Sequence, residues 1–202
     1  MTRTIALVTA GLSQPSSTRL LADRLAEATD RALRLHGEQA VVEVVELRDL
    51  AHEITNNLLT GFPAPALASA LDTVGRADGL IAVTPIFSAS YSGLFKSFFD
   101  VVEDGALEGK PVLAAATAGT ARHSLALDFA VRPLFAYLRA VVVPTAVFGA
   151  SEDFGSHASG SLAARVDRAA RELADGVVGH RSSTQVDPFE NPTPFAELLS
   201  GN

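Results

Sequence analysis

Hydroxyl side chains gather in a short segment near the N-terminus, residues 11–18 (GLSQPSST), between an apolar run and a helical pattern. Unpaired backbone N–H groups and the dipole at a helix start favour an anion. Ser13, Ser16, Ser17 and Thr18 can add hydroxyl donors. The segment therefore predicts a site for a phosphate monoester. The alternative is that Ser16 or Ser17 only caps the helix.

A second segment, residues 84–93 (TPIFSASYSG), combines apolar and aromatic side chains with small ones. Pro85 and Phe87 can lie against a flat ring system whose polar edge meets free backbone groups. The alternative is that Phe87 and Tyr91 fold back onto the core.

A third segment, residues 117–123 (TAGTARH), contains Gly119, which allows close approach of the backbone to a ligand. His123 follows closely enough to contact a ligand bound at this segment. The alternative is that it is merely exposed at a helix start. Pro133 in the following helix lacks the N–H that would bond the Phe129 carbonyl, so a kink or π-bulge is expected near residues 129–132. Such bulges often lie near functional sites.

The elements that position these segments follow from apolar runs bounded by turn residues. Four runs predict strands buried on both faces, and a fifth, with two glutamates, predicts an edge strand. They span residues 4–10, 79–84, 111–116, 141–148 and, for the edge strand, 41–47. Pro144 also indicates an edge. Helical patterns separate the strands at residues 21–35, 64–74, 94–101 and 162–177.

Strands that alternate with helices predict an α/β fold with parallel strands and right-handed crossovers. We expect a flavodoxin-like, doubly wound sheet of five parallel strands in the order 2-1-3-4-5, with helices on both faces. The three segments then follow strands one, three and four at the carboxyl edge, where ligands bind in such sheets. This domain is expected to span residues 1–179. Residues 180–202 are expected to form an extended C-terminal tail, either free or packed on the body or on a partner subunit.

Composition excludes several classes of function. With 16 basic and 23 acidic residues the net charge is −7, which disfavours nucleic-acid binding. The absence of cysteine excludes disulfides and thiolate metal sites. No apolar run suits a membrane span and no secretory signal is present, so a cytoplasmic protein is expected. The five histidines lack metal-ligand spacing, and no serine-nucleophile motif occurs. We expect the protein to hold a cofactor that supplies the reactive chemistry.

The three segments, in this order, resemble the NAD(P)H-dependent FMN reductases of the flavodoxin-like superfamily over roughly the first 150 residues. Residues 11–21 look like the phosphate loop of that family, and residues 84–87 with 90–96 and Asp100 look like its second motif. Residues 117–129 are similar to the third motif in the branch that supplies reduced flavin to two-component monooxygenases, both alkanesulfonate and luciferase-like.

The resemblance implies FMN as the flavin, NAD(P)H as the reductant, and hydride transfer to the flavin N5 from a nicotinamide stacked on the exposed ring face. It implies three groups of binding residues: Ser13, Ser16, Ser17 and Thr18 for the phosphate; Pro85, Ile86, Phe87 and Ser88 along the isoalloxazine; and Thr117, Ala118 and Gly119 at its other edge. No side chain need act as a general acid. It also implies a homodimer or homotetramer and a flavin-dependent, luciferase-like monooxygenase as partner.

Three departures from the family pattern stand out. Gln14 replaces an arginine that many members carry, so phosphate binding would depend on hydroxyls and backbone. Phe87 replaces a tyrosine, and Phe129 stands where the sulfonate-system enzymes have an aromatic hydroxyl tied to flavin exchange. Two alternatives remain: a reductase with permanently bound FMN acting on a quinone, azo dye or metal oxyanion, and a flavodoxin-like electron carrier. The preference for NADH or NADPH stays open.

Overall fold

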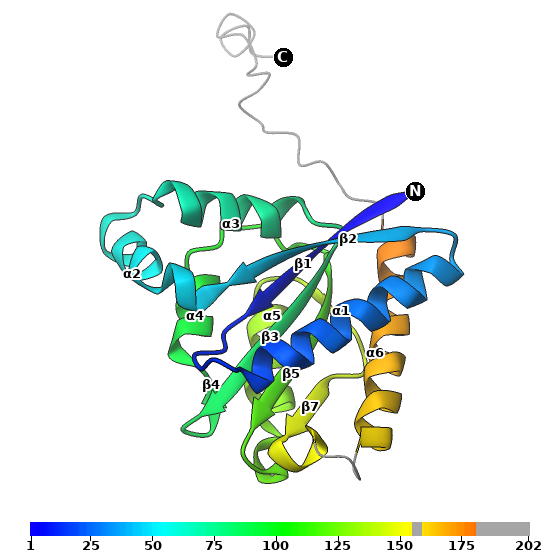
Figure 1. Ribbon diagram of the computed structural model, residues 1–202. Helices are drawn as coiled ribbons and strands as arrows, with labels where there is room; N and C mark the ends of the chain where they lie inside the picture. The colour runs from blue at the N-terminus through cyan, green and yellow to red at the C-terminus, as the bar shows by residue number, and fades with distance from the viewer. Residues whose placement is uncertain (155–158, 181–202) are drawn as a thin grey trace, which may run out of the picture.

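The computed structural model describes residues 1–154 and 159–180. Its centre is a twisted sheet in the order β2-β1-β3-β5-β6, with β7 also paired to β5 (Figure 1). All these pairs are parallel, whereas β4 forms an antiparallel hairpin with β3. The strands are β1 (Thr2–Thr9), β2 (Gln39–Glu46), β3 (Gly79–Phe87), β4 (Ser90–Tyr91), β5 (Pro111–Ala118), β6 (Val141–Val142) and β7 (Val147–Ala150).

The expected count of five strands is wrong, because the described part of the chain forms seven. The fifth expected strand is divided into β6 and β7 around Pro144, and both pieces pair with β5. Proline cannot donate to a ladder, which explains the break. The short β4 was not expected either, since it consists of two residues after a tight turn.

Helices cover both faces of the sheet (Figure 1). Helices α1 (Ser17–Leu35) and α6 (Ser159–Gly179) pack on one face, against Ile5 and Leu7 of β1. Helices α3 (Pro65–Arg76), α4 (Gly93–Phe99) and α5 (Arg132–Tyr137) pack on the other, against Ala6 and Val8. Neighbouring residues of a strand point to opposite faces, so one strand supplies both cores.

The core under α4 is aromatic. Phe99 has its ring centroid 4.8 Å from Phe95 and 5.0 Å from Phe135, the latter edge-on. Because Phe95 and Phe99 lie four residues apart, they share one face of α4. This packing fixes the helix that follows the second predicted segment.

Two helical segments follow β2 without having been expected, η1 (Leu47–Leu50) and α2 (Ala51–Thr60). In α2 only Ile54 and Asn57 are buried, so its sequence carries a weak apolar stripe.

The expected distortion before Pro133 is confirmed. A π-helical turn, η3 (Leu127–Val131), precedes α5, and the Arg132 N–H bonds the Leu127 carbonyl. Two 3₁₀ turns lie at the carboxyl ends of neighbouring strands: η2 (Ala121–His123) follows β5, and η4 (Ser151–Phe154) follows β7. The expected tail lies outside the described residues except for His180.

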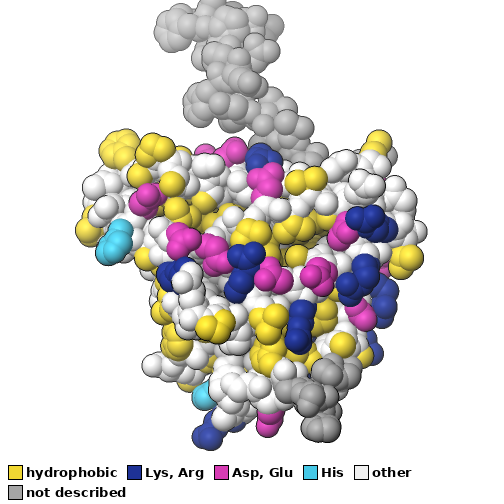
Figure 2. Space-filling model, in the orientation of Figure 1, with side chains coloured by type: hydrophobic (Ala, Val, Ile, Leu, Met, Phe, Trp, Pro, Cys, Tyr) yellow, Lys and Arg dark blue, Asp and Glu magenta, His cyan; other side chains and the backbone are white. Residues whose placement is uncertain are grey.

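The surface shown in Figure 2 carries basic and acidic side chains that alternate in a band over α1 and β2. Ion pairs of α1 and β2 include Arg19 with Asp23 and Arg19 with Glu46. Within residues 1–154 and 159–180, no helix has both the length and the apolar character needed to span a membrane.

Candidate functional site

The three predicted segments meet at one edge of the sheet, beyond the carboxyl ends of β1, β3 and β5. A hydrogen bond of 2.8 Å between the hydroxyls of Thr18 and Thr117 joins the first segment to the third. The parallel pairing of the strands produces this arrangement, because carboxyl ends of parallel strands share an edge.

In the first segment, Ser16 caps α1. Its Oγ accepts a hydrogen bond from the Arg19 N–H at 3.2 Å, which leaves the hydroxyl proton free to donate elsewhere. Ser13 and Ser17 are exposed beside it. Gly11 packs so closely that a Cβ there would come within 2.1 Å of Ser16 Oγ.

Thr18 differs from its three neighbours. It is 3% exposed, and its hydroxyl is used in the bond to Thr117. Thr18 is therefore buried and hydrogen-bonded to Thr117, whereas Ser13 and Ser17 are exposed. Its role in this geometry is to tie α1 to β5.

The second segment turns sharply between β3 and β4. Ser88 and Ala89 both have positive φ, 47° and 69°, which non-glycine residues seldom adopt. The turn leaves Phe87 48% exposed at the edge, whereas Tyr91 packs against Phe95 with a centroid separation of 6.0 Å. Of the two aromatic rings, Phe87 is thus the more exposed, whereas Tyr91 is half-buried.

The other predicted residues of this segment divide in the same way. Pro85 is half-buried and Ser88 is exposed. Ile86 is 8% exposed and belongs to the core, so its side chain does not line an open surface. The hydroxyl of Thr84 accepts from the Ser92 N–H at 3.1 Å, which holds the hairpin against the start of α4.

The third segment rises from the buried core to the surface within three residues. Thr117 is buried, Ala118 is half-buried and Gly119 is exposed, with open space where a Cβ would stand. His123 is half-buried at the end of η2, and Phe129 is 78% exposed on the outside of η3.

Arg48 is a residue of this edge that the sequence reasoning missed. It lies in η1, just beyond β2, and lines a cavity of about 380 Å³ together with Gly11, Ser13, Gln14 and Ser16. The register explains its place: Thr9 pairs with Glu46, so the chain two residues further on brings Arg48 level with Gly11. The expected order 2-1-3 places the end of β2 beside the first loop, but it is the register between β1 and β2 that brings residue 48 to this cavity.

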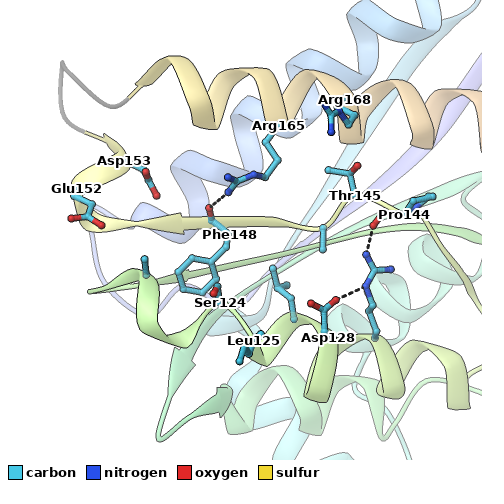
Figure 3. Close-up of a pocket in the computed structure, with 14 residues that line it drawn as sticks. Ser124, Leu125, Asp128, Pro144, Thr145, Phe148, Glu152, Asp153, Arg165 and Arg168 are labelled. Carbon is cyan, nitrogen blue, oxygen red and sulfur yellow. Dashed lines mark hydrogen bonds and ion pairs between the residues drawn. The ribbon is translucent and has the colours of Figure 1, made fainter.

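A second cavity of about 570 Å³ lies next to the third segment, between α6 and the η3–α5 segment, with residues of β7 between them (Figure 3). Two of its arginines already form hydrogen bonds within the protein. Arg132 donates to Asp128 and to the Val143 and Pro144 carbonyls, and Arg165 is 3.5 Å from the Phe148 carbonyl. Phe148 forms part of the apolar wall.

No cluster of His, Asp and Glu suited to a metal ion occurs in residues 1–154 and 159–180. The described edge thus combines a loop rich in hydroxyl groups, the exposed ring of Phe87 and the open backbone at Gly119.

Comparison with known proteins agrees with this geometry. The family model for NADPH-dependent FMN reductases matches residues 3–155. The chain is 35% identical over 180 residues to an FMN reductase (NADPH) of Pseudomonas aeruginosa, covering 88% of this chain and 94% of the relative. It is 34% identical over 168 residues to the NADH-dependent FMN reductase SfnE of Pseudomonas putida, covering 82% and 88%.

A solved structure of an oxidoreductase from Corynebacterium diphtheriae superposes with a TM-score of 0.86 at 47% identity, covering 89% of this chain and 99% of that one. The flavodoxin-like fold, the edge site and the sequence relationship have one consistent explanation. The chain belongs to the NADPH-dependent FMN reductase family and is an NAD(P)H:FMN oxidoreductase.

Proposed function

We propose that the enzyme reduces exchangeable FMN and supplies it to a separate, luciferase-like or alkanesulfonate-type flavin monooxygenase. The observation that carries the proposal is the exposed ring of Phe87 beside a half-buried Tyr91 that packs against Phe95. With one aromatic ring on offer in that hairpin, one face of the flavin stays open for a nicotinamide and the flavin is free to leave. The relatives named FMN reductases support the same reading.

We assign the phosphate to the hydroxyls of Ser13, Ser16 and Ser17 and to the first N–H groups of α1. The residues fit this group. The close approach of Gly11 to Ser16 leaves the turn without a side chain between its backbone and a ligand. At the end of β1, the hydroxyl of Thr9 is buried without a hydrogen-bond partner, so this edge has bonding capacity to spare.

We assign the ring system to the second and third segments. Pro85 and Phe87 lie along its face, and Ile86 and Ser88 contribute backbone groups. Thr117, Ala118 and Gly119 border its other edge, where Thr117 is held in place by Thr18. When bound, FMN supplies the chemistry, because its N5 accepts a hydride from NAD(P)H. The protein residues bind, orient and exclude water.

The test is rapid-mixing oxidation of NADH and NADPH with catalytic and then excess FMN, with and without air. We expect saturable dependence on free FMN and appearance of reduced FMN in solution. Turnover that is independent of added FMN and requires a quinone or azo acceptor would favour a reductase with bound flavin. Bound FMN without any nicotinamide oxidation would leave an electron carrier.

We also propose a cytoplasmic homodimer or homotetramer. Leu125, Phe129 and Tyr137 are 62%, 78% and 86% exposed between the residues just before η3 and the end of α5, and they offer apolar surface that a second copy can cover. Light scattering during size-exclusion chromatography measures the mass directly, and a single mass near 21.1 kDa would contradict an oligomer.

A further inference from the structure

We propose that Arg48 supplies the positive charge for the flavin phosphate, in place of the arginine that the first loop lacks, and that Gln14 positions it. The inference rests on the proposed function, since it assumes that the phosphate binds at the first segment. It assigns a phosphate-binding role to a residue of the β2–α2 connection, outside the three segments.

The geometry places Arg48 at the loop. Its side chain lines the same cavity as Ser13 and Ser16, and it is half-buried. In the amide orientation that gives both groups their partners, both Nη atoms of Arg48 donate to the side-chain oxygen of Gln14, Nη1 at 3.2 Å. Gln14 carries no charge itself, but its hydrogen bonds keep the guanidinium of Arg48 beside the first loop.

The other arginine of the cavity is already paired. Arg19 donates through Nε to Asp23 at 2.7 Å and through Nη1 to Glu46. Hydrogen bonds to these two carboxylates raise the pKa of Arg19. Its charge is therefore balanced within the described residues, and it has little left for a ligand.

Arg48 is held much less firmly by acids. Its one described ion pair is with Asp49, its neighbour in sequence, at 3.4 Å, and the Asp49 side chain is 65% exposed. A guanidinium has five N–H donors, so bonds to Gln14 and Asp49 leave others for phosphate oxygens. Its planar, forked shape suits phosphate better than an ammonium does.

The test compares FMN with riboflavin, which lacks the phosphate. Dissociation constants are measured by quenching of flavin fluorescence for the wild type and for Arg48→Gln. The variant is expected to weaken FMN binding by about tenfold or more, because hydrogen bonds to charged groups are strong. Riboflavin binding should change less than about twofold, since its contacts are retained. Arg34→Gln is the matched control: Arg34 is also an arginine in an exposed ion pair, but near the far end of α1.

Gln14→Leu tests the positioning role. It should reduce the preference for FMN over riboflavin in the wild type and have no further effect in Arg48→Gln. Additive effects of the two substitutions would show that Gln14 does not act through Arg48. Equal FMN affinity in the wild type and Arg48→Gln, or equal weakening of FMN and riboflavin, would overturn the assignment of Arg48. Failure of the wild type to bind FMN at all would instead overturn the proposed function.

Discussion

At the scale of single residues, the loop to which we assign the phosphate depends on tight packing around Gly11. A Cβ at this position would stand 2.1 Å from Ser16 Oγ and 3.2 Å from the Cβ of Thr18. The serine can rotate away, but it then leaves the N–H of Arg19 without its cap. The glycine thus allows the loop to cap a helix and keep its inner surface open.

Gly11→Ala is therefore expected to lower the free energy of unfolding by about 1 kcal/mol, the usual value of a cap, and to weaken FMN binding. Gly75→Ala is the control. A Cβ at Gly75 meets nothing within 4 Å, and alanine favours α3 by about 0.5–1 kcal/mol. Urea unfolding and FMN titration of both variants check the prediction. Unchanged FMN affinity in Gly11→Ala would contradict it.

Lys110 makes a second prediction at this scale. It is 5% exposed, and its Nζ donates to the carbonyls of Val74, Gly75 and Ala77 at 2.6–2.8 Å, at the end of α3. Burial lowers the pKa of Lys110 from 10.5 to about 8, and the charge of Asp78 offsets only part of this effect. Between these two pH values the folded protein releases a proton that the unfolded chain keeps.

The contribution of Lys110 to the free energy of unfolding should therefore rise with pH from about 8 to 10.5, by at most about 3 kcal/mol. Denaturant unfolding of the wild type and Lys110→Met at pH 7.5, 9 and 10.5 measures the difference. Background titration is small because the chain has two lysines and two tyrosines. A difference that does not change with pH would contradict the lowered pKa.

At the scale of the elements, two helices begin in the same way but differ in function. Ser16 caps α1 and Ser92 caps α4, each through a hydrogen bond of 3.2 Å from the N–H three residues later. Only Ser16 lines the cavity at the first loop.

Ser16→Ala and Ser92→Ala should each destabilise the protein by about 1 kcal/mol. Only Ser16→Ala should also weaken FMN binding, because it removes a hydroxyl donor at the phosphate. Thermal unfolding and flavin titration of the pair separate a lost cap from a lost ligand contact. Equal loss of affinity in both variants would mean that capping alone explains the effect.

The elements also show how far the sequence could predict the structure. Four of the five apolar runs, at 4–10, 41–47, 79–84 and 111–116, correspond to β1, β2, β3 and β5, with ends differing by up to three residues. Pro133 predicted the π-turn because a missing N–H has a local consequence. Helix α2 was missed because it buries few residues.

The site was predictable to a similar degree. The segments after β1, β3 and β5 do meet, since topology determines which loops share an edge. Whether a given hydroxyl already forms a hydrogen bond within the protein was not predictable. Thr18, for example, bonds to Thr117, a residue 99 positions away. Arg48 was missed for the same reason, because its place depends on the register between β1 and β2. Local patterns identify loops, whereas tertiary contacts decide which side chains remain free.

At the scale of the whole molecule, the candidate site is built from segments that lead into the helices on both faces of the sheet. The first segment leads into α1, which packs on one face, and the second leads into α4, which packs on the other. The Thr18–Thr117 bond joins α1 to the central part of the sheet. A ligand that contacts all three segments therefore links both layers, and its binding energy should stabilise the entire fold.

Binding to the folded state alone raises stability by about 2.7 kcal/mol when the ligand is present at 100 times its dissociation constant. For a chain of this length that corresponds to a rise in Tm of about 5–10 °C. We expect this rise with FMN and a smaller one with the same concentration of riboflavin, because riboflavin makes no phosphate contacts. Differential scanning calorimetry with each flavin measures it. Equal shifts with both flavins would show that the first segment does not bind the phosphate, whereas a shift with FMN alone would make the phosphate contacts the main source of affinity.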